Sequence, residues 1–402
     1  MKNLCGTAAA IVAAGALALT ACGGGGGGGG GGSEAGANSD PVKIMAFGSF
    51  SQPPFAVPEI VAGARAAVDR VNREGGVAGR QVSLVTCDDK GSPNGAAACG
   101  RQAVQERVAA VVGAFTFFGD SIVPLLDKAS IPYILPVANN PEENSNRVSF
   151  PLFSGATAEI GAYAAVTHDK CAKVAVMAND VASAHALYDG YQVPVAKQVG
   201  IAAIPVYIPV TATDIAPFIA QARAAGADCF SYGVSAQLTS AGLRTLAQAG
   251  DHARGASNAL ALPEVVLGQI SAESQGFLAV SNFYYPSSGK TAAVQLARDI
   301  AAVDKSAPVD DASINAYAGV LVFRQAAKSL TDVTGTSVLG ALGGLKTLDV
   351  GLFPPVDMTT IGYMKTIPRM PHTDLIVYVA RDGKYVPSDQ PDVDLSKLLA
   401  GL

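Results

Sequence analysis

The chain has 402 residues, of which 49% are hydrophobic and 15% are charged, and its formal net charge at pH 7 is −5. This length allows two domains with sizeable cores. The mild acidity and the lack of a basic run argue against nucleic-acid binding. No stretch after the first 21 residues approaches 18 uninterrupted apolar residues, which argues against a transmembrane helix.

The first 21 residues have the pattern of an export signal. They hold one charge, Lys2, and an apolar stretch over residues 7–21 that is too short to span a hydrocarbon core of about 30 Å. The segment ends in the letters LTAC, residues 19–22, which resemble the processing site of bacterial lipoproteins, where the cysteine becomes the first residue and carries acyl chains. We predict a lipoprotein signal peptide over residues 1–21 and lipidation of Cys22. A plain signal peptide followed by a chance cysteine is the alternative.

Ten glycines, residues 23–32, follow this cysteine. Ordering glycine costs more backbone entropy than ordering any other residue, so this segment favours neither helix nor strand. We interpret residues 22–40 as a Gly-rich tether with a root-mean-square reach of roughly 20–25 Å. Two or three acyl chains would anchor a soluble domain to a membrane. The predicted location is the cell envelope, lipid-anchored on the outer face of the cytoplasmic membrane, or the periplasm.

The sequence contains six cysteines. The first, Cys5, would leave with the signal, and the second is the predicted lipid site. Four remain, and an even number in an oxidising compartment favours two disulfides. Zinc binding is the alternative, but no C-x-x-C pair occurs and no histidine lies at ligand spacing. We therefore expect no metal site and no cofactor.

Short β-type runs alternate with Ala-rich helical runs along the chain. In a first series the predicted strands are residues 42–47, 81–87, 108–114 and 131–137. The helices between them are predicted at residues 58–74, 93–107 and 120–129. This order is typical of a parallel sheet with helices on both faces.

A second series begins at residue 171, with predicted strands at residues 171–178, 203–210 and 228–234 and helices at residues 185–199 and 215–225. A later helix, residues 313–330, and a later strand, residues 374–380, are interpreted as returns to the two lobes. The predicted fold class is α/β, with two doubly wound parallel-sheet lobes and a ligand cleft between the carboxyl ends of their strands. We assign residues 41–155 and 284–355 to lobe I and residues 156–283 and 356–402 to lobe II.

One stretch makes a family resemblance specific. Residues 71–89, VNREGGVAGRQVSLVTCDD, resemble the N-x-x-GG-x-x-G-R turn of the leucine/isoleucine/valine-binding protein family, the type I periplasmic binding proteins of ABC importers. Gly75, Gly76 and Gly79 suit a turn that needs positive φ between a helix and a strand. Further similar stretches follow in order, at residues 111–115, 131–141, 211–230 and 315–330. The resemblance implies the type I periplasmic binding protein fold.

The two disulfides can be placed on this fold. Cys87 ends the second strand and Cys99 lies in the helix that follows, so we expect these two to pair. Cys171 and Cys229 open two strands of lobe II that would lie side by side, so we expect the second pair there. Both disulfides are interpreted as structural bonds.

Motifs that would indicate an enzyme are incomplete or missing. The GKT at residues 289–291 lacks the first glycine of a phosphate-binding loop, because residue 284 is tyrosine, and no G-x-S-x-G or H-E-x-x-H occurs. Adjacent residues at a strand end point to opposite faces, so Asp88 and Asp89 are interpreted as turn and capping groups. We predict that the protein is not an enzyme. The alternatives are a non-transport ligand sensor or receptor on the same fold and, less favoured, a hydrolytic enzyme.

The resemblance implies ligand contacts from three loops of lobe I. These loops follow the first, third and fourth strands, and helix N-termini near them favour anions. The predicted ligand-binding residues are Phe55, Phe115, Thr116, Phe117, Phe118, Val137, Ala138 and Asn139. At least one of the three phenylalanines at residues 115–118 is expected to face the cleft.

The sequence departs from its relatives at ligand positions. The family's serine that holds an α-carboxylate falls on Phe117, and the threonine of the fourth-strand loop falls on Asn139. The tyrosine expected in lobe II falls in residues 180–186, which contain none, and Glu264 is a candidate partner for an ammonium group. We therefore expect a small, largely apolar or aromatic ligand, acids included, rather than leucine, isoleucine or valine held in the usual way.

The predicted function is that of an extracytoplasmic solute-binding lipoprotein of an ABC importer. It would capture a small molecule of the branched-chain amino acid, amide or aromatic acid type by closure of the lobes, and deliver it to the membrane permease. The expected partners are this ligand and the ABC permease subunits, and the expected state is a monomer.

Overall fold

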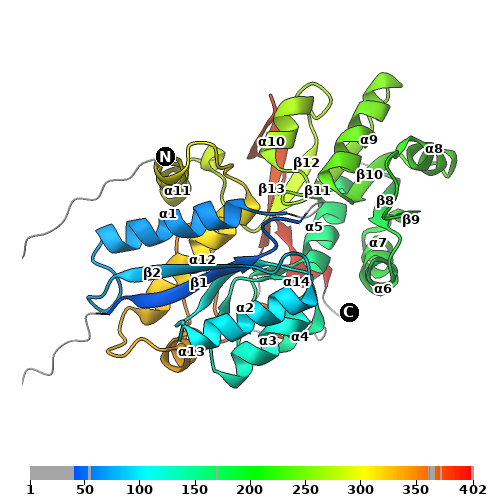
Figure 1. The fold of residues 1–402 in the computed structure, drawn as a ribbon. Coiled ribbons are helices and arrows are strands. Elements are labelled where there is room, and N and C mark those ends of the chain that lie inside the picture. Colours follow the sequence, from blue (N-terminus) through cyan, green and yellow to red (C-terminus); the bar gives the residue numbers. More distant parts are fainter. Residues whose placement is uncertain are drawn as a thin grey trace, which may run out of the picture. The chain divides into compact units, whose positions relative to one another are not determined.

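The computed structural model describes residues 40–52, 56–168, 171–360, 362, 367–371 and 374–399. The predicted signal peptide, most of the tether, Cys22 and Phe55 lie outside the described residues. Within the described part of the chain, no helix combines the length and the apolar character that a membrane crossing requires. The described strands belong to two sheets (Figure 1).

All seven strands of the first sheet pair in parallel. The sheet has the order β2-β1-β3-β4-β6, and β5 pairs with both β3 and β7. The strands are β1 (Val42–Gly48), β2 (Val82–Asp88), β3 (Val111–Phe115), β4 (Tyr133–Ile134), β5 (Val137–Ala138), β6 (Ser149–Phe150) and β7 (Phe153–Ser154).

Helices cover both faces of this sheet. Side chains of β1 alternate between two hydrophobic clusters: Ile44 and Ala46 pack with α1 (Glu59–Arg73) and α12 (Asp311–Ala327). Met45 and Phe47 pack with α2 (Pro93–Gln105) and α3 (Gly119–Lys128). The sheet is therefore buried on both faces, which is why its strands read as nearly continuous apolar runs. Three more helices pack on these: α4 (Pro141–Ser145) contacts α3, α11 (Thr291–Val303) contacts α1, and α13 (Gly335–Gly343) contacts α12.

The helix α12 lies unusually close to its neighbours, because glycines face it. A Cβ added at Gly63 of α1 would lie 2.1 Å from the backbone oxygen of Ser313. A Cβ at Gly113 of β3 would lie 2.2 Å from the Cα of Ala316, and Gly113 also has a positive φ of 57°. Only glycine fits at these two positions, so α1, β3 and α12 are held in one arrangement.

The second sheet has the order β14-β13-β12-β11-β10-β8-β9, with β15 paired to β13. Its parallel strands are β8 (Lys173–Asn179), β9 (Ala202–Ile208), β10 (Cys229–Gly233), β11 (Arg254–Asn258) and β12 (Leu278–Ser281). The antiparallel strands are β13 (Asp374–Arg381), β14 (Lys384–Pro387) and β15 (Val393–Asp394).

Helices again cover both faces of the second sheet. One face packs against α5 (Gly155–Thr167) and α7 (Val193–Val199), and the other against α8 (Ala216–Ala224) and α9 (Ala236–Gln248). Before α7 come α6 (Ala182–Leu187) and a π-helical turn, Tyr188–Gln192. Two short helices, α10 (Glu264–Leu267) and α14 (Leu395–Leu398), lie later in the chain, with 3₁₀ turns at Gly268–Ile270 and Pro286–Ser288.

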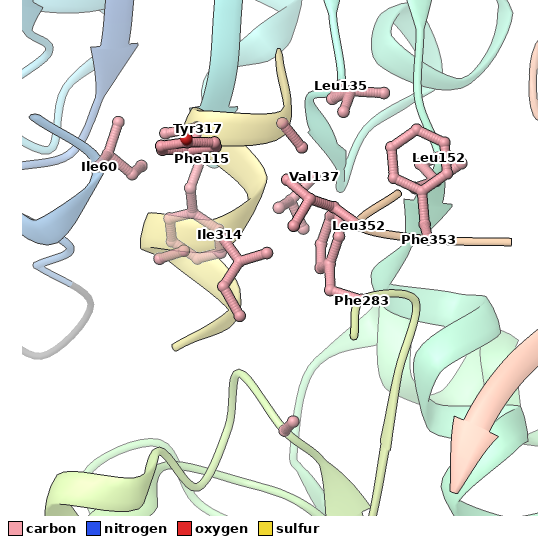
Figure 2. Packing of buried hydrophobic residues seen from close by; sticks show 14 of the residues in the cluster. Ile60, Phe115, Leu135, Val137, Leu152, Phe283, Ile314, Tyr317, Leu352 and Phe353 are labelled. Atoms are coloured by element: carbon pink, nitrogen blue, oxygen red, sulfur yellow. The ribbon is translucent and has the colours of Figure 1, made fainter. Parts of the chain in front are cut away.

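The segments that pass between the sheets share a core with the first sheet. Figure 2 shows part of this cluster, in which Phe115 at the end of β3 lies beside Ile314 of α12. Phe283 follows β12, and its ring meets that of Phe353 with centroids 6.3 Å apart. The crossing segments are therefore anchored by buried aromatic side chains.

The predicted fold class, two α/β lobes with mainly parallel sheets, is confirmed. The predicted strand 131–137 is wrong as one piece: Leu135 has a positive φ of 51° and Pro136 follows it, so the strand divides into β4 and β5. The first series also continues through β6 and β7. The strand predicted at residues 374–380 is present, but it is antiparallel. The lobe boundaries stay a prediction.

Both predicted disulfides are confirmed. Cys87 at the end of β2 is bonded to Cys99 of α2, with Cα atoms 5.6 Å apart. Cys171, just before β8, is bonded to Cys229 at the start of β10, with Cα atoms 5.9 Å apart. The first bond ties a helix to its sheet, and the second ties two neighbouring strands together.

Candidate ligand-binding site

A cavity of about 340 Å³ lies at the carboxyl ends of strands from both sheets. From the first sheet it is lined by the loops after β3 and β5 and by the starts of α1 and α12. From the second sheet it is lined by the ends of β8, β10 and β11 and by the starts of α5 and α9. Open α/β sheets bind ligands at this edge, and the volume suits a small molecule.

Two phenylalanines form an apolar part of the cavity wall. Phe115 is buried in the core, with 8% of its surface exposed, whereas Phe117 is 47% exposed. Their rings meet edge to face, with centroids 5.4 Å apart and planes at 78°. The expectation that at least one of these phenylalanines faces the cleft therefore agrees with the lining of the cavity. An exposed ring at a cavity wall offers a large apolar contact to a ligand.

Thr116 and Phe118 do not line the cavity. The Thr116 hydroxyl is buried, donates to Asp89 Oδ2 at 2.6 Å, and accepts from the backbone N–H of Phe118 at 3.0 Å. Phe118 packs against the core cluster between the sheet and α2 and α3. The hydroxyl that we expected to contact a ligand therefore shapes the loop instead.

Asp89 connects the loops that follow β1, β2 and β3. Besides Thr116, its carboxylate accepts from the Ser49 hydroxyl at 2.8 Å and from the backbone N–H of Gly91 at 2.7 Å. Its neighbour Asp88 points elsewhere and accepts from the Ser51 hydroxyl at 2.6 Å. Both aspartates therefore act as turn groups, as the sequence indicated.

A buried glutamate positions the loop after β5. The backbone N–H of Asn139 donates to Glu143 Oε2 at 2.9 Å, and Asn140 Nδ2 donates to the same oxygen at 2.6 Å. Tyr133 donates its hydroxyl to Glu143 Oε1 at 3.2 Å. Burial raises the pKa of Glu143 to about 8, although the hydrogen bond from Asn139 opposes this. Glu143 therefore supports a cavity wall without lining it.

The three predicted residues after β5 differ in their contacts. Val137 and Asn139 line the cavity, whereas Ala138 is buried and is not part of the lining. Asn139 Nδ2 donates to the backbone oxygens of Thr116 at 3.3 Å and of Val137 at 3.1 Å. Both hydrogens of this amide are therefore used inside the protein.

Three carboxyl groups line the cavity: Glu59, Asp310 and Glu159. Burial and the charge of Asp310 raise the pKa of Glu59 to about 7. Burial also raises the pKa of Asp310, against hydrogen bonds from Ser313. Burial raises the pKa of Glu159 to about 8, against a hydrogen bond from Asn258. None of these three carboxyl groups was among the predicted ligand-binding residues.

The lining from the second sheet was also not predicted. Asn258 Nδ2 donates to Glu159 Oε1 at 2.9 Å, and its Oδ1 accepts from the backbone N–H of Ala261 at 2.7 Å. Ser235 caps α9 by accepting from the backbone N–H of Leu238. The sequence carried a signal for this region, since residues directly after buried strands of a parallel sheet lie at its binding edge.

Neither Glu264 nor residues 180–186, where the family's lobe II tyrosine was expected, line the cavity. Glu264 Oε1 accepts from the backbone N–H of Tyr385 at 2.8 Å, so this side chain supports β14. In residues 180–186, Asp180 lies 2.8 Å from His185, whose ring stacks on Tyr207 with centroids 3.6 Å apart. Both sets of contacts lie outside the lining of the cavity.

A larger cavity of about 530 Å³ lies at the opposite edge of the second sheet, where β11 and β12 begin. Ligands of open α/β sheets bind at the carboxyl ends of the strands, so this cavity is a weaker candidate for the solute site. One group of described side chains, Cys171, Asp228 and Cys229, is close enough to hold a metal ion. Both of its cysteines form a disulfide, so they offer no thiolate.

The model of one protein family, described as periplasmic binding protein, matches residues 46–364 of the chain. No curated protein matches the chain. Several solved structures share its fold. A fatty acid ABC transporter substrate-binding protein from Thermomonospora curvata is 16% identical, with a TM-score of 0.75 over 90% of this chain and 95% of that chain.

Two further structures were solved with small molecules bound. A solute-binding protein of an ABC transporter from R. palustris, in complex with 4-hydroxybenzoate, is 17% identical, with a TM-score of 0.71 over 88% of this chain and 97% of that chain. A branched chain amino acid ABC transporter from Thermus thermophilus, with bound valine, is 16% identical, with a TM-score of 0.73 over 90% of this chain and 99% of that chain. At these identities the likeness establishes the fold.

Proposed function

Because the chain belongs to the periplasmic binding protein family, we propose that it is an extracytoplasmic solute-binding lipoprotein of an ABC importer. It captures a small molecule between its two sheets and delivers it to a membrane permease. The observation that carries this proposal is the cavity of about 340 Å³, which takes its walls from both sheets. A ligand that contacts both walls stabilises the closed arrangement relative to the open one.

The ligand class follows from the cavity walls. Val137 and the exposed ring of Phe117 provide apolar contact, and polar side chains such as Asn139 and Asn258 lie beside them. This mixture suits a molecule with an apolar body and a few polar groups. Compounds of the branched-chain amino acid, amide and aromatic acid type form the starting panel.

The test is mass spectrometry of small molecules that co-purify with the full chain, followed by calorimetry with each compound identified. We expect one compound to bind in a 1:1 ratio and to be recovered unchanged after long incubation. Chemical conversion of that compound would favour the hydrolytic alternative. If the protein binds the compound but cells that lack its gene take the compound up at the normal rate, the sensor or receptor alternative is favoured.

A further inference from the structure

The cavity wall combines three carboxyl groups with a few polar side chains. Both hydrogens of the Asn139 amide are donated to backbone oxygens, and its Oδ1 faces Gly155, where an added Cβ would lie 3.0 Å from it. Asn258 donates its amide to Glu159. These internal hydrogen bonds occupy the amide of Asn139 and one hydrogen of Asn258, while Asn179 and Ser235 add further polar groups to the lining beside three carboxyl groups.

The carboxyl group of Glu159 reaches the cavity because residue 233 has no side chain. A Cβ added at Gly233 would lie 2.5 Å from Glu159 Oε2. Glu159 lies in the second turn of α5, outside the positions that cap a helix. Its place is therefore set by the packing of α5 against β10 and by Asn258, and its second oxygen faces the space that Gly233 leaves open.

Glu59 and Asp310 form a second acidic wall on the opposite side. Asp310 caps α12 by accepting from the backbone N–H of Ser313 at 3.1 Å, so its presence has a structural reason. Glu59 begins α1, where a negative charge also suits the helix N-terminus, and the hydrogen bond to its carboxylate comes from its own backbone. Two carboxyl groups beside each other in a partly buried site repel when both are charged.

The lining residues that the structure describes include no Lys, Arg or His side chain. Three carboxyl groups therefore face the cavity without a cationic side chain among them. Burying a charge is costly unless a partner of opposite charge is present. A cationic ligand would supply that partner.

We propose that the ligand of this cavity is an organic cation without a carboxylate: an ammonium or amidinium group between Glu159 and the Glu59–Asp310 pair, with an apolar body against Phe117. This inference rests on the proposed solute-binding function and names its substrate class. It replaces our expectation that acids are among the ligands, because the cavity offers an acid no cationic side chain.

One feature of the wall favours an anion, and the experiment must address it. Ser235 and Ala236 begin α9 at the cavity, and a helix N-terminus attracts negative charge. A zwitterion would use this N-terminus together with the carboxyl groups. The test therefore compares three charge types on the same apolar body.

The probes form two matched series. The aromatic series is 2-phenylethylamine, phenylalanine and 3-phenylpropanoate, and the aliphatic series is 3-methylbutylamine, leucine and 4-methylpentanoate. Calorimetry uses the full chain in detergent at pH 8.5, where the amines keep their charge and the carboxyl groups of Glu59 and Glu159, with pKa values of about 7 and about 8, are mostly ionised. In at least one series we expect the amine to bind tenfold or more tightly than the acid, and at least as tightly as the amino acid.

Variants assign the effect to the cavity. We expect Glu159→Gln and Glu59→Gln each to weaken amine binding tenfold or more, because each removes a negative charge and keeps the shape of the side chain. The matched control is Asp332→Asn, which neutralises an exposed carboxylate outside the cavity and should leave amine affinity unchanged. Thermal unfolding of each variant without ligand shows that the fold is intact.

The outcomes separate this inference from the proposed function. An acid or an amino acid that binds tenfold tighter than its amine would overturn the inference of a cationic ligand. Amine affinity that neither glutamine variant changes would also overturn it. Both results would leave the solute-binding function standing. If none of the six probes binds, the charge of the co-purified compound decides: a cation supports the inference, and any other compound overturns it. No probe binding and no co-purified compound would overturn both.

Discussion

The backbone N–H of Asn139 donates a hydrogen bond of 2.9 Å to Oε2 of Glu143, a carboxyl group that is wholly buried behind the cavity wall. Two further hydrogen bonds, from Tyr133 and Asn140, meet the same carboxyl group. The position of Asn139 at the cavity therefore depends on a residue that touches no ligand. A buried polar cluster of this kind is costly to break, because its remaining members lose their partners.

Glu143→Ala is expected to destabilise the fold by about 2–4 kcal/mol, because it leaves the donors of Asn139, Asn140 and Tyr133 without their acceptor. Urea unfolding measures this loss. The control Glu106→Ala removes a partly exposed ion pair with Lys43 and should cost at most about 1 kcal/mol. Equal losses in the two variants would show that Glu143 has no special role.

Phe117→Ala is expected to reduce ligand affinity, whereas Phe115→Ala is expected to reduce the stability of the fold. The Phe117 ring is 47% exposed at the cavity, so its loss should change stability by less than about 0.5 kcal/mol and weaken ligand binding roughly tenfold. Phe115 is core, and its loss should cost about 3–5 kcal/mol. Calorimetry and urea unfolding of both variants separate the two roles. Unchanged affinity in Phe117→Ala would remove this ring from the ligand site.

The two disulfides should stabilise the protein by different amounts. They close segments with sequence separations of 12 and 58 residues, for which the loop-entropy model gives about 3 and about 4 kcal/mol. We therefore expect the Cys171→Ala/Cys229→Ala double variant to lose more stability than the Cys87→Ala/Cys99→Ala variant. Thiol titration in denaturant without reductant should find none of these four cysteines free.

Stability should fall as the pH rises from 5 to 8. Burial raises the pKa of Glu143 and of Glu159 to about 8, and that of Asp311 to about 7, all well above the ordinary values of these side chains. Between the unfolded and folded pKa values the folded state holds more protons than the unfolded state, so raising the pH favours unfolding. Each group contributes at most about 1.4 kcal/mol per pKa unit.

Urea unfolding at pH 5.5, 7 and 8.5 measures this slope. The carboxylates with lowered pKa, such as Asp88 and Asp251, titrate below this range and do not offset it. Glu143→Gln should flatten the slope, because its side chain cannot titrate. Stability that rises with pH over this range would contradict the raised pKa values.

Cys22→Ala is expected to abolish lipid attachment. No other cysteine follows a Leu-x-Ala sequence at the end of the predicted signal. Metabolic labelling with radioactive palmitate should mark the wild-type chain and leave the variant unlabelled. Labelling of the variant would show that the anchor has been assigned to the wrong residue.

Much of the fold could be predicted because periodic apolar runs and glycine turns are local signals. The segments at Val42–Gly48 and Glu59–Arg73 have such patterns, and their bounds were predicted within one or two residues. The break at Leu135 was missed because a positive φ at a leucine leaves no mark in composition. The antiparallel direction of β13 was also hidden, since direction depends on the path of the chain between the sheets.

The site was less accessible to sequence reasoning. Phe117 was found because three phenylalanines in four residues cannot all face one core. Glu59 and Glu159 were missed because each is a single acidic residue on a helix, which usually means a solvated surface. Their meeting at one cavity depends on which helix ends lie at the same edge of two sheets, and on the missing side chain at Gly233.

The glycine contacts of α1 and α5 determine which distances in the cavity are constant. Gly63 holds α1 against α12, so the spacing of Glu59 and Asp310 would stay constant in the proposed closure of the lobes. Gly161 holds α5 against Leu375 of the second sheet, where an added Cβ would lie 2.1 Å away, so Glu159 travels with that sheet. The constant distance between Glu59 and Asp310 therefore limits how wide a ligand group can be at this end of the cavity. The distance from this pair to Glu159 would change with closure, so closing the lobes would bring both acidic walls onto the same cationic group.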